Sequence, residues 1–95
     1  MWETIRGCER AELAGGAYAL WVVPEWKTPV VDKVRWTLEH GKAILASHGA
    51  EDFDAAKADA RTVATRVLRS FADMGADAER QRVLEAALKD LEALQ

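Results

Sequence analysis

The chain has 95 residues, of which 49% are hydrophobic and 31% charged, and its formal net charge is −3. This length predicts one domain with a thin core, to which a second copy or a partner would add stability, and the apolar fraction excludes a disordered chain. The acidic balance excludes a general electrostatic attraction to nucleic acid or anionic lipid, and a single cysteine, Cys8, excludes an internal disulfide.

The first 27 residues form an aromatic segment that is hard to assign. Residues 2–14 show a weak helical pattern, which Gly15 and Gly16 should break or hinge. In the apolar run 17–23, tyrosine, tryptophan and paired valines favour a strand. However, no second strand is evident to pair with it, and a lone strand leaves its backbone groups unpaired. We therefore favour a helix here, ending before Pro24, with a strand as the alternative.

The next segment predicts a helix over about residues 29–48. Thr28 is a good N-cap, Pro29 suits the first helical position, and Gly49 is a typical residue just after a helix. At 100° per residue, the following side chains fall within one narrow stripe: Val30, Val34, Leu38, Gly41, Leu45 and His48.

Two further helices are predicted over residues 52–74 and 77–94. The first begins near Glu51 or Asp52 and ends at Met74 and Gly75, and Asp77 caps the second. Their apolar stripes contain, in the first helix, Phe53, Ala56, Ala60, Ala64, Val67, Phe71 and Met74, and in the second, Val83, Leu84, Ala87, Leu88, Leu91 and Leu94.

These elements predict an all-α fold. Short connections make the three helices antiparallel neighbours in a small bundle. The whole chain, residues 1–95, is then a single helical domain, and residues 1–27 pack on the bundle or extend it.

The four tryptophans all lie between residues 2 and 36, and Trp36 sits apart from the helical stripe. It lies about 160° from the centre of that stripe, so it would face away from a core lined by the helix. We interpret it as part of an interaction surface with Trp21, Trp26 and Tyr18. The alternative is that the N-terminal segment folds over this face and covers it.

Gly41 lies in the middle of the predicted stripe, where glycine costs roughly 1 kcal/mol relative to alanine. Close packing of a neighbouring helix against Gly41, Ala60 and Ala64 would compensate for that cost. The alternative is a notch that admits a ligand.

Arg61, Arg66 and Arg69 are expected on the outer face of the second helix, where they suit an acidic partner or phosphate groups. This surface is shared or bordered by Asp54, Asp59 and Asp73, so an ordinary solvated face is the simpler interpretation.

No metal, cofactor or catalytic residue is predicted. His40 and His48 are eight residues apart, which is about 12 Å along a helix and too far for one metal ion. Cys8 lacks a local signature of nucleophilic catalysis, and the chain has no glycine-rich phosphate loop.

These observations favour a non-enzymatic helical protein–protein interaction module, such as an adaptor, inhibitor or regulator, that self-associates through its Trp-rich surface. Its partner is then a protein or a second copy of the chain. One alternative is a small-molecule binder or simple enzyme with a Trp-lined pocket, and a further one is a nucleic-acid regulator using the arginine face. No apolar run reaches the roughly 20 residues that span a bilayer, so we expect a cytoplasmic protein without membrane contact.

Overall fold

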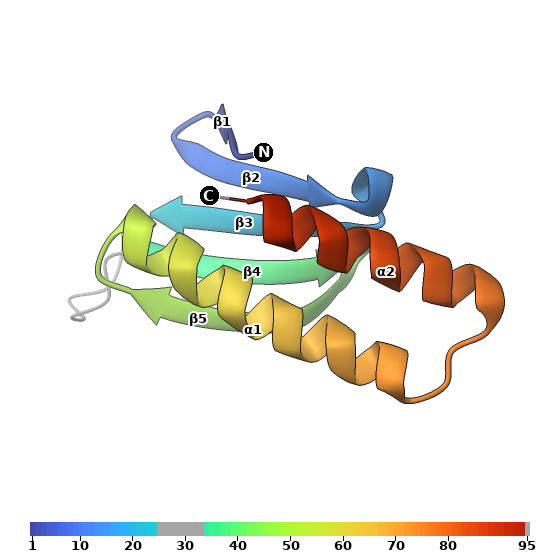
Figure 1. Ribbon diagram of the computed structural model, residues 1–95. Coiled ribbons are helices and arrows are strands. Elements are labelled where there is room, and N and C mark those ends of the chain that lie inside the picture. The colour runs from blue at the N-terminus through green and yellow to red at the C-terminus, as the bar shows by residue number, and fades with distance from the viewer. Residues whose placement is uncertain (25–33, 95) are drawn as a thin grey trace.

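The computed structural model describes residues 1–24 and 34–94, which form a five-stranded antiparallel sheet and two helices (Figure 1). The strands follow one another in the sheet in chain order, and both helices pack on the same face. The elements are β1 (Glu3–Ile5), β2 (Cys8–Leu13), the 3₁₀ turn η1 (Ala14–Gly16), β3 (Tyr18–Pro24), β4 (Val34–His40), β5 (Ala43–Ala50), α1 (Phe53–Asp73) and α2 (Ala78–Ala93).

The predicted all-α bundle is therefore wrong, because the segment expected as the helix 29–48 contains β4 and most of β5, which ends at Ala50. Val34, Trp36 and Leu38 alternate with polar residues, and all three are buried on the inner face of the sheet. Val34 and Leu38 satisfy the helical spacing of four as well as the strand spacing of two, so they fit both patterns. Trp36 fits only the strand pattern. Residues 29–33 of the predicted helix lie outside the described residues.

The N-terminal segment is also sheet rather than helix. Arg6 and Gly7, both with positive φ, connect β1 to β2 in a two-residue hairpin turn. Strand β3 pairs with β2 on one side and β4 on the other. Those two partners supply the backbone hydrogen bonds whose apparent absence argued against a strand at residues 17–23.

The two C-terminal helices are confirmed, with bounds close to those predicted. Asp52 accepts a hydrogen bond from the backbone nitrogen of Ala55 at 2.8 Å. Asp77 likewise accepts one from the backbone nitrogen of Arg80 at 2.8 Å. Both caps satisfy a backbone donor that the first helical turn leaves unpaired. For this reason the capping residues in the sequence are enough to locate the start of each helix.

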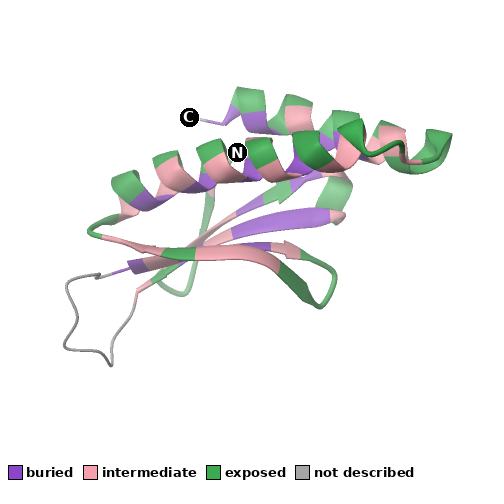
Figure 2. Ribbon diagram, turned by 90° about the horizontal axis from the view of Figure 1, so that it is seen from below, coloured by how far each residue is buried: buried purple, intermediate pink, exposed green. Residues whose placement is uncertain are grey.

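The core lies between the sheet and the helix pair (Figure 2). Small residues of α1 face the sheet, so the helix axis approaches the strands closely and the larger side chains of the strands fill the remaining space. The buried residues of the helices are Ala56, Ala60, Ala64 and Leu68 in α1, and Leu84, Ala87 and Leu91 in α2.

Candidate functional site

The two faces of the sheet have different environments. The helices cover the inner face, and no helix within residues 1–24 and 34–94 covers the other, which we call the outer face (Figure 2). A cross-strand row on the outer face runs from Arg10 to Trp21, then to Thr37 and Ser47. All four residues are half-buried, and Trp21 lies at the centre of the sheet in β3.

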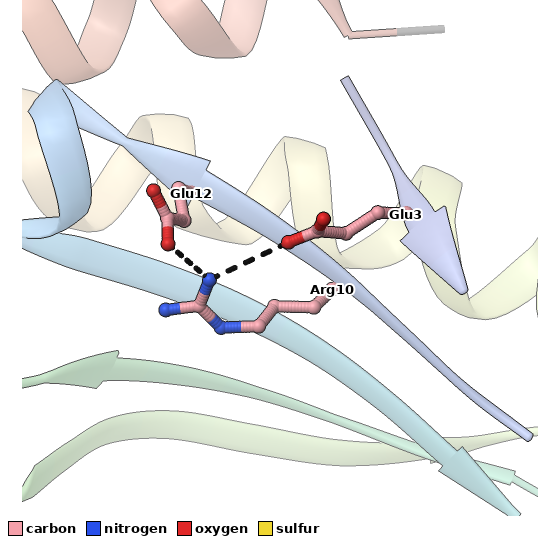
Figure 3. Close-up of polar contacts among 3 residues, drawn as sticks. All are labelled: Glu3, Arg10 and Glu12. Atoms are coloured by element: carbon pink, nitrogen blue, oxygen red, sulfur yellow. Dashed lines mark hydrogen bonds and ion pairs between the residues drawn. The ribbon is translucent and has the colours of Figure 1, made fainter. Parts of the chain in front are cut away.

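Arg10 covers part of Trp21 and is itself held by two carboxylates. Its guanidinium carbon lies 5.3 Å from the centroid of the Trp21 ring, a cation–π contact. Its Nη1 lies 2.5 Å from a carboxylate oxygen of Glu12 and 3.6 Å from one of Glu3 (Figure 3). The two carboxylates outnumber the one guanidinium, so the charge balance of this group disfavours the binding of phosphate.

Hydroxyl groups occupy the other half of the row. The Thr37 and Ser47 hydroxyl oxygens are 3.3 Å apart, and Ser47 also donates to the backbone carbonyl of Trp36 at 3.0 Å. Arg35 reaches Ser47 from the neighbouring row at 3.4 Å. The outer face thus combines an aromatic centre with hydroxyl and charged groups around it.

Two residues of the predicted interaction surface lie in the core instead. Trp36 is 0% exposed and Tyr18 2% exposed, and both belong to the inner face. Trp21 lies on the opposite face, because successive residues of a strand point to opposite sides. Trp26 lies outside the described residues. The structure therefore does not bring Trp21 together with Trp36 and Tyr18.

Trp2, the remaining tryptophan, packs on the helix side. The centroid of its ring lies 5.5 Å from the ammonium nitrogen of Lys57 in α1. Lys57 also forms a 2.7 Å ion pair with Glu9 of β2. These contacts attach the N-terminal strands to α1. Of the tryptophans in residues 1–24 and 34–94, Trp21 is therefore the one that lies on the outer face.

The three residues predicted to allow close helix packing, Gly41, Ala60 and Ala64, do not lie together in the structure. Ala60 and Ala64 are fully buried in α1. Gly41 lies instead in the turn between β4 and β5, with φ of 60° and open space around it. Its role is therefore conformational, since this left-handed backbone favours glycine, and the helix-packing interpretation of Gly41 is corrected.

The three arginines of α1 do not form one basic site. Arg61 donates to the backbone carbonyl of Leu94, just after α2, and so joins the two helices. Arg66 and Arg69 are exposed and line an open hollow of about 600 Å³ that also contains Asp73. A carboxylate beside two guanidinium groups weakens any attraction for phosphate.

A second hollow, of about 340 Å³, lies where the sheet meets the start of α2. The His40 ring stacks on Tyr18 with centroids 4.5 Å apart, and its Nδ1 lies 2.9 Å from the carbonyl oxygen of Ala17. Asp77 and Arg80 line the other side. Sequence reasoning missed this group, because the sheet and the helix bring together residues that are distant along the chain.

Reasoning from the sequence also missed most of the outer face. It singled out Trp21 but not Arg10, Glu12, Thr37 or Ser47. The signal was the alternation within residues 8–13, where Arg10 and Glu12 alternate with the buried residues Ala11 and Leu13.

Within the described residues, no three His, Cys, Asp or Glu side chains converge on a point that could hold a metal ion. In that same part of the chain, no helix has the length and apolar character needed to cross a membrane. Comparison with known proteins gives no relative, since no family model, curated protein or solved structure matches the chain.

Proposed function

We propose that the protein is a non-enzymatic interaction module that binds a folded partner protein through the outer face, with Trp21 as the central contact. The observation that carries this proposal is the half-buried Trp21 at the middle of a sheet face that no described helix covers. Tryptophan and arginine are enriched among the residues that dominate protein–protein binding energy, and Arg10 lies directly over Trp21.

The charges around Trp21 favour a protein over a nucleic acid. Glu3 and Glu12 neutralise Arg10, so counterion release from phosphates would contribute little to binding at this face. The hydroxyls of Thr37 and Ser47 are neutral donors and acceptors that suit the polar rim of a protein interface.

The shape of the face favours a protein over a small molecule. A pocket walled by Trp21, Trp36 and Tyr18 would need all three on one side of the sheet, and Trp36 and Tyr18 are on the other. A broad sheet surface offers contact area rather than enclosure, and enclosure is what a small ligand requires.

The test compares Trp21→Ala with Trp2→Ala, a matched loss of a half-buried tryptophan on the helix side. A photo-crosslinking residue at Val23, exposed on β3, would first trap the partner so that it can be identified and purified. Binding of the purified partner is then measured by calorimetry. Trp21→Ala should weaken binding by about 30-fold or more, as expected for a dominant contact, while Trp2→Ala retains it.

Equal affinities for wild type and a folded Trp21→Ala variant would contradict the proposal. So would trapping of nucleic acid at Val23 in place of a protein. If the trapped partner is a second copy of the chain, the face is a self-association surface, and the proposal of a separate partner protein is overturned.

A further inference from the structure

The two edges of the sheet differ in how well they are protected against pairing. One edge is β1, which has three residues and begins with Glu3. The other is β5, which has eight residues, Ala43–Ala50, with the sequence AILASHGA. Strand β5 contains no Asp, Glu, Lys, Arg or Pro. Among the described residues, no strand pairs with its outer edge.

An unprotected edge strand presents a row of unpaired backbone N–H and C=O groups to any other strand. Proteins usually protect such edges with short strands, charged residues or proline. Strand β1 is short, whereas β5 carries none of these devices apart from one bulge near its start, where the register with β4 shifts between Leu38 and Glu39. Beyond the bulge, Ala46–Ala50 pair regularly with β4, so their outer edge is suited to another strand.

The composition of β5 suits pairing with an identical strand. A two-fold axis perpendicular to the sheet places two copies of β5 side by side and antiparallel. The strand contains no Asp, Glu, Lys or Arg, and His48 is its one ionisable residue, so this arrangement opposes no two carboxylates and no two ammonium or guanidinium groups. Ile44, 65% exposed at the start of β5, would lose water contact at the same edge.

The position of α1 is compatible with this pairing. Helix α1 packs over β4 and β5 (Figure 1). Paired strands lie about 4.8 Å apart, so a continuous sheet brings the two copies of α1 to roughly the 8–10 Å separation of packed helices. Val63 is half-buried, and at 100° per residue it shares a flank of α1 with Asp59 and Arg66.

That flank is complementary to itself in charge. Asp59 and Arg66 are seven residues apart, about two helical turns. When the two-fold axis passes beside Val63, midway between these positions, Asp59 of one copy lies toward Arg66 of the other. Opposite charges therefore face each other across the two-fold axis, while the partly buried Val63 contributes apolar area.

We propose that β5 is a self-association edge, at which two copies of this chain pair antiparallel to form a continuous ten-stranded sheet with four helices on one face. The occupant of the edge is a second copy, because a strand without Asp, Glu, Lys or Arg and the α1 flank are both self-complementary. The outer face remains free in each copy, so this inference does not rest on the proposed binding at Trp21.

The test introduces two lysines on β5, Ile44→Lys with His48→Lys, at two exposed positions. The matched control, Thr4→Lys with Ile5→Lys, adds the same charge at exposed positions of β1. Sedimentation equilibrium over a range of concentrations should show a dimer for wild type and for the β1 variant. The β5 variant should dissociate at concentrations about tenfold higher or more, because charged side chains on an edge strand disfavour its pairing with a second strand.

Hydrogen exchange on the wild-type chain gives a second measurement that needs no variant. Half of the β5 amides should become less protected on dilution, since alternate N–H groups of the strand point to the partner copy. A wild type that stays monomeric would overturn the inference. A dimer that resists the β5 lysines but is lost in Trp21→Ala would also overturn it and would place self-association on the outer face instead.

Discussion

The indole nitrogen of Trp36 donates a 2.6 Å hydrogen bond to the carboxylate of Asp59, which joins β4 to α1 across the core. Trp36 is fully buried, so its N–H has no access to water and needs a protein acceptor. Asp59 supplies that acceptor from a half-buried position on the helix. The bond therefore fixes where α1 lies along the strand, which nonspecific apolar packing alone would specify less well.

Removing the acceptor should destabilise the fold. We expect Asp59→Ala to lower the free energy of unfolding by about 1–3 kcal/mol, because the buried indole N–H is left unpaired. Urea unfolding followed by tryptophan fluorescence measures the change. Asp73→Ala, an exposed carboxylate near the end of the same helix, is the control and should leave stability within about 0.5 kcal/mol of wild type. Equal stability of Asp59→Ala and wild type would show that this bond does not contribute.

Substitution of Gly41 by alanine should change the free energy of unfolding in one direction in the observed hairpin and in the opposite direction in the predicted helix. Because Gly41 has φ of 60°, Gly41→Ala should lower the free energy of unfolding by about 1 kcal/mol, although nothing lies within 4 Å of the added methyl group. In a helix interior, the same change would instead stabilise by about 1 kcal/mol. Thermal unfolding gives the sign directly. Gly41→Asn should cost less than Gly41→Ala, because asparagine tolerates the left-handed region better.

The alanines of α1 that face the sheet should not tolerate larger side chains. Ala64 is 0% exposed, so Ala64→Leu forces the helix away from the strands, at a cost of about 1–3 kcal/mol. Ala55→Leu, at an exposed position of the same helix, is the matched control and should be nearly neutral. Chemical denaturation of both variants measures the difference, and a stable Ala64→Leu variant would mean that space exists between α1 and the sheet.

In residues 34–50, the spacing of apolar residues is not enough to distinguish a helix from a strand. Val34 and Leu38 fit a helix and a strand equally well, so the stripe they form does not distinguish the two. Trp36 was the discordant residue in the helical interpretation, and its place between Val34 and Leu38 on the inner face accounts for that discordance. An aromatic residue off the helical stripe but on the alternating pattern was therefore a signal for a strand.

The candidate site was predictable only in part. Trp21 is identifiable as an aromatic residue in an apolar run, whereas its neighbours Arg10, Thr37 and Ser47 come from three other strands. They meet only because the strands pair in this register. The burial of Trp36 likewise depends on α1 packing over β4.

The sequence by itself determined the two C-terminal helices, with their caps at Asp52 and Asp77, because helical hydrogen bonds and caps join residues a few positions apart. Only the tertiary structure decided that residues 3–24 and 34–50 form a sheet, since each strand takes its backbone partners from another segment. It also decided which tryptophan is in the core and which is on the outer face, because that choice follows from which side of the sheet the helices cover.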